Sequence, residues 1–582
     1  MKQFLSLSIV LTILLACGDS KSPSDFDFAT RFESSKGLET ATYDEVIEFY
    51  SELAEAYPSV RMYEMGPTDS GKKLNLVTFN PDRTFESEFH DRAQKNILLI
   101  NNGIHPGESD GIDASMIFMR DLAQGNIPAP RNTIIAVIPT YNIGGALNRN
   151  STSRTNQNGP LEYGFRGNAR NFDLNRDFIK TDTKNAGSFA YLFHVLNPDL
   201  FIDTHVSNGA DYQYTLTHLF TQHNKLGGSL GNYLQSEFMT QLEDSLNSKG
   251  WPVTPYVNVY NRTPESGFSQ FFDAPRYSTG YTSLFNTLGM MVETHMLKPY
   301  KLRVEGTYEL LKSFTYIADK DWETIKELRK IAFSNYTPGS DYPIAWSIDS
   351  SQTRILDFKG YEATMIPSKI TGVNRLKYNT NKPFTKKVNY YDYYKPDRTI
   401  KVPEKYIVPA GWFQVIWELD NNDISMKKVV EDTVITAQVY TISNYETRQR
   451  PYEGHYPHYN TEVQVSVEEV IVKKGDYIID TDQPGVRFLL ETLEPMAVDS
   501  YFNWNYFDTI LQQKEGFSSY VWEDMAEDFL KNNPEIKKAF EEKKASDPAF
   551  SQNWYLQLDW IHKQSPYYET SHLRYPIVRV GG

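Results

Sequence analysis

The chain has 582 residues, of which 40% are hydrophobic and 23% are charged, a composition typical of a folded protein larger than one domain. Its 33 glycines and 30 prolines are too few for a collagen-like or linker-dominated protein. The formal net charge of −15 repels phosphate backbones, so we expect no nucleic-acid partner.

The N-terminal residues have the pattern of an export signal. A basic residue, Lys2, precedes the apolar stretch 4–15, which is too short to span a bilayer of roughly 30 Å. The single cysteine, Cys17, follows Leu-Leu-Ala and resembles the lipidated cysteine of a bacterial lipobox, although an unmodified thiol is the alternative. We therefore predict a signal peptide over 1–16, and a lipidated cysteine with a flexible tether over 17–36. The protein would then be exported and attached to a lipid bilayer, on the periplasmic or cell-surface face of a bacterial membrane.

Strand and helix patterns alternate in the next part of the chain, which predicts an α/β domain over 37–335 with a largely buried central sheet. Thr42 and Glu45 form a capping-box pattern for a helix that runs to about Tyr57, and a hairpin is expected after it. The predicted strands are 60–65, 74–79, 97–100, 134–138, 200–202 and 290–292, and the later helices are about 110–122, 185–196, 228–248 and 300–332.

Beyond residue 335 the pattern changes to the alternation of half-buried strands, which predicts a mostly β accessory domain over 336–480. The runs with this pattern are 412–419, 433–442 and 461–468. Residues 481–582 are expected to form a mixed α/β region. It contains a strand-like run at 486–490 and a helix that begins at Asn533-Pro534 and ends near Pro548.

Two histidines and a glutamate follow the ends of predicted strands. His105 and Glu108 come directly after 97–100, and their spacing lets both side chains reach one metal ion. The pair alone is a weak signal, because 11 histidines and 74 acidic residues produce such spacings by chance, and a hydrogen-bonded turn is the alternative. His205 closes the strand 200–202, and strand ends are where ligands collect in an open α/β sheet.

Two further groups have the chemistry of a catalytic cleft. Glu293 ends the apolar run 290–292, where burial of a carboxylate costs free energy and therefore suggests that the residue has a function. Asn175 and Arg176 follow Asp173 closely, and an arginine presents a planar fork that matches a carboxylate.

In this order, His-x-x-Glu, Asp-x-Asn-Arg, His and Glu resemble the zinc carboxypeptidase A family over about residues 40–330. The resemblance implies a mixed, twisted sheet flanked by helices. It implies a zinc metallocarboxypeptidase, a peptide hydrolase whose substrates are peptides or peptide-like molecules with a free C-terminal carboxylate. It also implies one zinc ion per chain, held by His105, Glu108 and His205.

The same resemblance assigns roles to four other residues. Asp173 matches the acid that orients the first histidine ligand. Asn175 and Arg176 match the pair that binds the terminal carboxylate of the substrate. Glu293 matches the general base that takes a proton from zinc-activated water.

Two assignments stay open between neighbouring residues. Arg166 is favoured over Arg170 as the residue that polarises the scissile carbonyl. Either Tyr277 or Tyr281 would be the tyrosine that closes over the substrate. Structural packing in a loop is the alternative for both tyrosines.

The substrate is less constrained than the reaction. Ser278 and Arg276 are expected to border the specificity pocket, where Arg276 would favour an acidic terminal side chain. A zinc amidohydrolase acting on peptidoglycan stem peptides or acyl-amino acids is an alternative function on the same fold. A non-catalytic surface binding protein is a third possibility, against which the complete ligand set and Glu293 argue.

Overall fold

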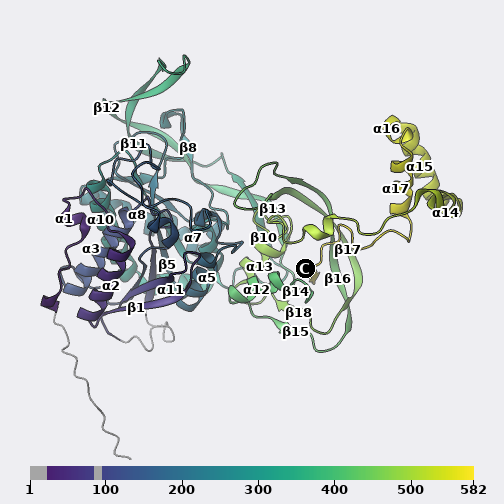
Figure 1. The fold of residues 1–582 in the computed structure, drawn as a ribbon, viewed down its shortest axis with the longest axis horizontal. Helices are drawn as coiled ribbons and strands as arrows, with labels where there is room; N and C mark the ends of the chain where they lie inside the picture. Colours follow the sequence, from purple (N-terminus) through teal and green to yellow (C-terminus); the bar gives the residue numbers. More distant parts are fainter. Residues whose placement is uncertain (1–22, 84–94) are drawn as a thin grey trace, which may run out of the picture.

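The computed structural model describes residues 23–83 and 95–582, and the statements below concern these residues. An α/β unit, from α1 (Arg31–Ser34) to α11 (Trp322–Ala332), is followed by a β-rich region (β10 to β19), from which a small helical bundle projects (Figure 1). Within the described residues, no helix combines the length and the apolar character that a membrane crossing requires. The predicted signal peptide and Cys17 lie outside the described residues.

The central sheet of the α/β unit has eight strands among the described residues, in the order β1-β2-β4-β3-β5-β9-β6-β7. β4, β3, β5 and β9 are parallel to one another, whereas β1, β2 and β6 add antiparallel pairs, so the sheet is mixed as expected. All predicted strands of this unit are present in it. The strands are β1 (Val60–Pro67), β2 (Lys73–Phe79), β3 (Asn96–Asn101), β4 (Thr133–Ile138), β5 (Leu200–Ser207), β6 (Leu216–Phe220), β7 (Val253–Pro255) and β9 (Leu288–His295).

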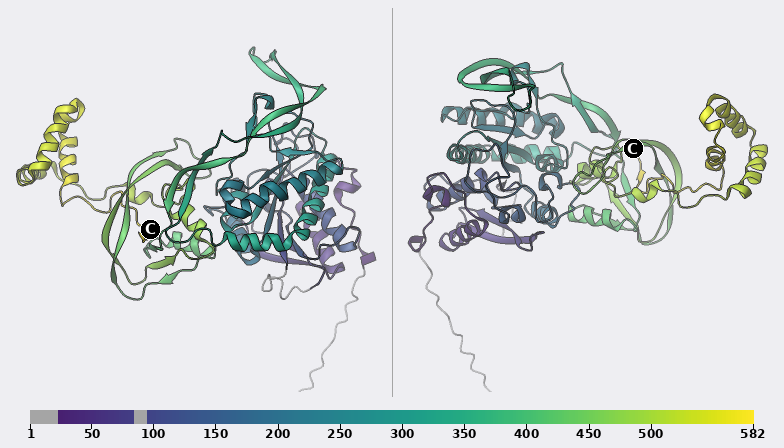
Figure 2. Two further views of the ribbon diagram at one scale, coloured as in Figure 1. Left: turned by 180° about the vertical axis from the view of Figure 1, so that it is seen from behind. Right: turned by 45° about the horizontal axis from the view of Figure 1, so that its top comes forward.

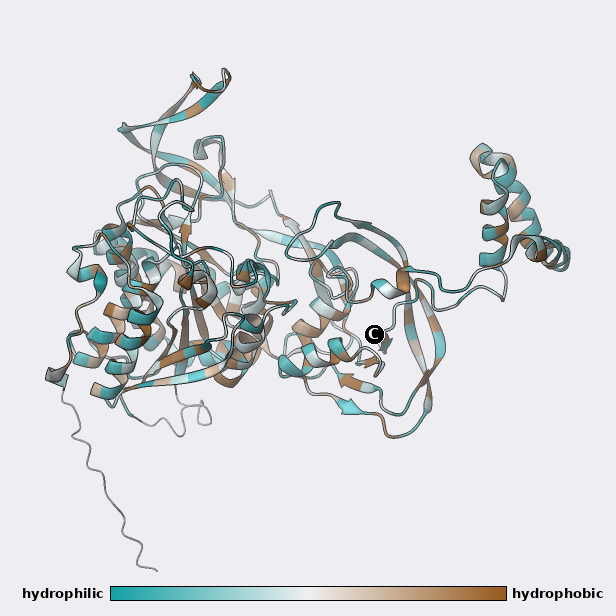
Figure 3. Cartoon of the chain, in the orientation of Figure 1, coloured by the Kyte–Doolittle hydropathy of each residue, from teal (hydrophilic) through white to brown (hydrophobic). Residues whose placement is uncertain are grey.

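Both faces of this sheet are covered, because its central strands are hydrophobic on both sides (Figure 3). One face packs against α2, α3, α8 and α10. The other face packs against α5 and the β-rich region. The helices are α2 (Tyr43–Ala56, which begins at the predicted capping box), α3 (Asp110–Gln124), α5 (Lys184–Leu196), α8 (Met239–Ser248) and α10 (Tyr300–Lys320).

Three further sheets make up the β-rich region. β10 pairs with β13, and the long hairpin of β11 and β12 is extended by β8 of the α/β unit. The six-stranded sheet has the order β15-β18-β14-β19-β16-β17. The strands are β8 (Phe268–Ser269), β10 (Asp341–Ile348), β11 (Arg354–Pro367), β12 (Asn374–Tyr391), β13 (Tyr394–Lys401), β14 (Lys405–Val408), β15 (Lys427–Lys428), β16 (Thr433–Thr447), β17 (His458–Val472), β18 (Tyr477–Asp480) and β19 (Val578–Val580).

The β-rich region and the α/β unit share one hydrophobic core. Ile97 and Leu99 of β3 belong to the same buried cluster as Tyr342, Val402 and Tyr406 of the β-rich region. The second face of the central sheet is therefore completed by residues that lie far along the chain.

The helical bundle has a core of its own. Trp522, Phe540, Phe550 and Leu558 pack together in it, and Figure 2 shows it apart from the rest of the chain. The bundle contains α14 (Ser519–Asn532), α15 (Pro534–Ser546), α16 (Pro548–Ser551) and α17 (Trp554–Gln564), of which α15 is the helix predicted after Asn533.

The helix predicted over 300–332 is in fact two helices, α10 and α11 (Trp322–Ala332). The chain bends between them at Asp321. Its carboxylate accepts hydrogen bonds from the Tyr233 hydroxyl and the Gln241 amide, which stabilise the bend from outside the helix.

Two predicted strands were wrong. Residues 412–419 lie mostly in helix α12 (Phe413–Asn421), and residues 486–490 lie in helix α13 (Val486–Leu493). Every residue of α13 is buried. The run 486–490 is too short to show a helical period, so it could not be distinguished from a buried strand.

Candidate active site

The predicted metal ligands meet at one edge of the central sheet, where the adjacent parallel strands β3, β5 and β9 end. His105 and Glu108 lie in the connection from β3 to α3. His205 lies in β5, directly opposite Glu293 of β9. The carboxyl ends of parallel strands lie on the same side of a sheet, so residues that are distant in sequence come together there.

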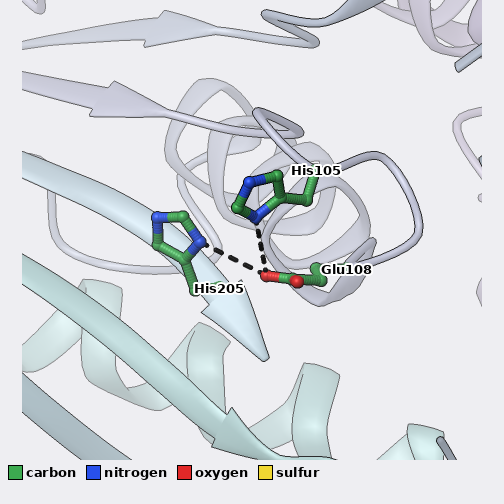
Figure 4. A group of neighbouring side chains, drawn as sticks. All are labelled: His105, Glu108 and His205. Carbon is green, nitrogen blue, oxygen red and sulfur yellow. Dashed lines mark hydrogen bonds and ion pairs between the residues drawn. The ribbon is translucent and has the colours of Figure 1, made fainter. Parts of the chain in front are cut away.

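The three ligand side chains point toward a common centre (Figure 4). Glu108 Oε2 lies 3.3 Å from His105 Nδ1 and 3.2 Å from His205 Nδ1. Two ligands held tetrahedrally by zinc at about 2.0–2.1 Å lie roughly 3.3 Å apart, which matches this spacing. His105 Nδ1 is also buried without a hydrogen bond, an unfavourable state for a polar atom unless it binds an ion. The donor set therefore fits zinc.

Asp173 holds the opposite side of the His105 ring. Its Oδ1 lies 2.9 Å from His105 Nε2, an arrangement that fixes the imidazole and leaves Nδ1 facing the centre. Its Oδ2 lies 2.9 Å from Arg166 Nη2. Burial raises the pKa of Asp173, but His105, Arg166 and Arg176 lower it far more, so this carboxylate is ionised.

Asp203 makes the corresponding contact with His205, which the sequence patterns did not lead us to predict. Its Oδ2 lies 3.0 Å from His205 Nε2, and the Ser278 hydroxyl and Asn101 amide donate to the same carboxylate. Asp203 and His205 are two residues apart on β5, and alternate residues of a strand face the same side. The contact between Asp203 and His205 could therefore have been predicted from this two-residue spacing.

Arg154 is a second residue that the sequence did not identify. Its Nη1 lies 2.8 Å from Glu108 Oε1, the oxygen turned away from the histidines, while its Nε donates to Gln157. Burial raises the pKa of Glu108, but Arg154 and His105 reverse this effect and hold it well below its ordinary value. Arg154 lies in an irregular loop, where no periodicity or motif distinguishes it from the other arginines of the chain.

The two arginines considered for the scissile carbonyl lie in different places. Arg166 lines the cavity over the ligands, and its Nη1 lies 3.6 Å from Glu108 Oε1. Arg170 instead donates to the backbone carbonyl of Asp182, and its guanidinium lies over the ring of Phe172. Only Arg166 of this pair faces the cavity.

Glu293 lines the same cavity. Burial raises its pKa to about 7; His205 opposes this shift, whereas Glu108 adds to it. A carboxyl group that titrates near neutral pH can both accept and return a proton under physiological conditions.

The cavity has a volume of about 320 Å³ and contains the predicted substrate-binding residues. Asn175 and Arg176 both line it, and the Arg176 guanidinium lies over the ring of Tyr277, 4.7 Å from its centroid. Tyr277 thus borders the cavity, whereas Tyr281 is fully buried and donates its hydroxyl to Asn422. Six of the eight further lining residues that were not predicted are apolar or aromatic, namely Val206, Leu219, Tyr256, Tyr260, Phe271 and Met291, and the other two are Asn208 and Asn258.

Arg276 and Ser278 do not border the cavity as expected. Arg276 Nη2 lies 2.6 Å from Asp499, and its guanidinium lies over the ring of Trp504. Its charge is therefore neutralised inside the protein, so the expected position of Arg276 was wrong and it gives no basis for a preference for an acidic terminal side chain. Ser278 is buried and donates to Asp203.

Comparisons with known proteins give matches to carboxypeptidases. A family model described as zinc carboxypeptidase matches residues 46–199, a range that ends before His205. The chain is similar to Carboxypeptidase 2 from Trichophyton rubrum, with 20% identity over 499 residues that cover 80% of this chain and 84% of that protein. Among solved structures, carboxypeptidase A from Helicoverpa armigera is 14% identical, with 49% of this chain and 74% of that chain covered and a TM-score of 0.38. A metallo-carboxypeptidase from Burkholderia cenocepacia is 16% identical, with coverage of 50% and 70% and a TM-score of 0.36.

Proposed function

We propose that this chain, of which residues 46–199 match the zinc carboxypeptidase family model, is a peptide hydrolase that removes the C-terminal residue of peptides that end in a free carboxylate. The observation that carries this proposal is one cavity lined by His105, His205 and Glu108 together with Glu293 and Arg176. Groups that bind a metal ion, accept a proton and pair with a carboxylate are thus within reach of one small substrate. A non-catalytic binding protein has no need for this combination.

We assign the metal to His105, Glu108 and His205. When bound there, zinc lowers the pKa of a water molecule and polarises a carbonyl group as a Lewis acid. Asp173 and Asp203 keep the two imidazole rings oriented by holding the nitrogen that faces away from the metal centre.

Glu293 is the proposed general base. It accepts a proton as water attacks the scissile carbonyl and returns it to the departing amine. Arg166 faces the same space and donates hydrogen bonds to the carbonyl oxygen as negative charge develops on it.

Arg176 and Asn175 are the proposed clamp for the substrate carboxylate. A buried carboxylate requires a partner, and a guanidinium fork supplies two charge-assisted hydrogen bonds in fixed geometry. The Tyr277 ring under the Arg176 guanidinium holds the fork in place. This arrangement favours a free chain end over an internal peptide bond.

The test compares matched peptides with a free or an amidated C-terminus, using purified protein with and without a chelator. We expect release of the terminal residue from the free acid only, loss of activity with the chelator, and recovery with added zinc. Elemental analysis should give one zinc ion per chain, most of which is lost in His205→Ala. Equal cleavage of both peptides would favour the amidohydrolase, and undiminished zinc in His205→Ala would contradict the ligand assignment.

We also propose that Cys17 is lipidated and attaches the exported protein to a bacterial membrane. The lone cysteine after Leu-Leu-Ala supports this proposal. Cys17→Ser should abolish labelling by a fatty-acid analogue and move the protein to the soluble fraction. Continued labelling of this variant would contradict the proposal.

A further inference from the structure

The turn between β16 and β17 of the β-rich region lies against the loop that carries Asp173. This turn consists of residues 452–455 and is closed by two backbone hydrogen bonds between Tyr452 and His455. Glu453 Oε2 accepts a hydrogen bond of 2.9 Å from the backbone N–H of Asp173. Next to it, His455 Nε2 lies 2.8 Å from the Asp182 carboxylate.

The approach of the two segments is close. A methyl group added to Gly454 would lie 3.2 Å from the ring of Phe172, the residue before Asp173. The 452–455 turn is therefore packed onto the loop of the α/β unit that carries Asp173, whose side chain contacts the proposed metal ligand His105.

Glu453 completes the set of contacts that immobilise Asp173. The Asp173 side chain faces His105 and Arg166, and its carbonyl accepts the backbone N–H of Arg176. The remaining polar group is the backbone N–H, which Glu453 holds. Loss of this bond would free the backbone from which the Asp173 carboxylate orients the imidazole.

The backbone conformation of the 452–455 turn does not favour a glutamate at position 453. Glu453 and Gly454 both have positive φ, 49° and 81°, as in hairpin turns that favour asparagine, aspartate or glycine. Glutamate is a poor choice for the first position, and a non-glycine residue in this region persists where other contacts compensate. The longer side chain carries its carboxylate to Asp173, which accounts for its presence.

We propose that Glu453 is a positioning residue of the active site: it fixes the backbone at Asp173 and thereby the orientation of His105 and Arg166. The inference rests on the proposed function, since it uses the Asp173–His105 contact. It gives the β-rich region a part in catalysis, although none of its described residues lines the cavity.

Three variants in the full-length protein separate this role from a purely structural one. Glu453→Gly removes the carboxylate and suits the positive φ, so it should leave the thermal unfolding midpoint unchanged or higher. Glu453→Gln keeps an oxygen that accepts the Asp173 N–H. Glu446→Ala is the matched control, because Glu446 belongs to the same hairpin but, among the residues that the structure describes, forms side-chain hydrogen bonds with Tyr459 and Asn460 of the hairpin itself.

The readouts are the zinc dissociation constant, measured by competition with a chelator, and kcat and KM on a free-acid peptide. For Glu453→Gly we expect zinc binding and kcat/KM to weaken by about tenfold, the lower end of the effect of residues that orient metal ligands. Glu453→Gln should stay within about twofold of wild type, because its amide still accepts the hydrogen bond, and Glu446→Ala should match wild type.

Wild-type zinc affinity and turnover in a stably folded Glu453→Gly would overturn the inference while leaving the proposed function intact. Equal losses in Glu453→Gly and Glu446→Ala would also overturn it, because they would reflect general destabilisation of the hairpin. A wild-type protein that binds no zinc would overturn both the inference and the proposed function.

Discussion

Four carboxylates surround the proposed metal centre, and their surroundings divide them into two kinds. Glu108, Asp173 and Asp203 each lie against an imidazole or a guanidinium. Glu293 lacks such a close partner among the described residues and has its pKa raised to about 7 by burial. Environments that separate the pKa values of neighbouring carboxyl groups are how one site supplies both fixed charge and a proton acceptor.

Replacement of Glu293 by glutamine should abolish most turnover without loss of the metal. A neutral amide of nearly the same shape cannot take the proton from water, so kcat should fall by at least about a hundredfold. Zinc content and the thermal unfolding midpoint should stay close to wild type. His205→Ala is the contrasting variant, since it should lose zinc as well as turnover. Near wild-type kcat in Glu293→Gln would remove this residue from the mechanism.

The pH dependence should report the same residue. Glu293 must be deprotonated to act as a base, so kcat/KM should fall as the pH is lowered through its pKa. The positive charge of bound zinc favours the carboxylate, so the midpoint should lie below 7 but above the ordinary glutamate value of 4.5. The measurement is kcat/KM against pH with zinc saturating throughout. A flat profile across this interval would contradict the assignment.

Arg176 should determine the preference for a free chain end. Loss of one partner of a buried charge pair costs roughly 3–5 kcal/mol, so Arg176→Ala should lower kcat/KM on free-acid peptides by at least about a hundredfold. Arg176→Lys should recover only part of this, because a point charge lacks the planar fork. Arg170→Ala is the matched control, since Arg170 lies away from the cavity. Equal effects of Arg176→Ala on free and amidated peptides would contradict the clamp.

At the scale of strands and loops, the cavity wall predicts the preferred terminal residue. β6, β9 and the segment around Phe271 contribute Leu219, Met291 and Phe271 to it, without a charged side chain beyond the proposed catalytic and clamp groups. A charged terminal side chain would be buried there without a partner. Peptides ending in leucine or phenylalanine should therefore have kcat/KM at least about tenfold above those ending in aspartate or lysine. A wild-type preference for peptides that end in aspartate would contradict this prediction. Leu219→Arg should create such a preference, because it places a positive charge in the cavity wall.

Sequence patterns predicted the central strands of the α/β unit well, because β3, β4, β5 and β9 each contain a continuous apolar run. They failed at residues 486–490, because this run is too short to show whether its period is that of a helix or of a strand. In the site, His105, Glu108 and His205 could be found by spacing and strand position. Arg154 could not, because its partner Glu108 is reached through an irregular loop whose path only tertiary packing defines.

For the molecule as a whole, the shared core predicts that the α/β unit does not fold alone. A chain ending at residue 335 would expose the face of the central sheet that includes Ile97 and Leu99, and we expect it to be insoluble or unfolded. The fraction of this shortened chain that stays soluble tests the first outcome, and circular dichroism of the soluble part tests the second. The matched control removes the helical bundle by joining Leu511 to His572. Leu573 N–H already donates to the Ile510 carbonyl at 2.8 Å, so the ends meet, and this variant should keep its fold and zinc. A soluble, zinc-binding chain of residues 1–335 would contradict this view.

The position of β19 has a consequence for how the protein is made. Residues Val578–Val580 lie between β14 and β16, near the middle of the six-stranded sheet, and Tyr406 of β14 pairs with Arg579. A ribosome must therefore release nearly the whole chain before this sheet can close, and the face of the central sheet that depends on the β-rich region stays uncovered until then. We expect this part of the polypeptide to stay incompletely folded until β19 has emerged, a state that would suit the export proposed above.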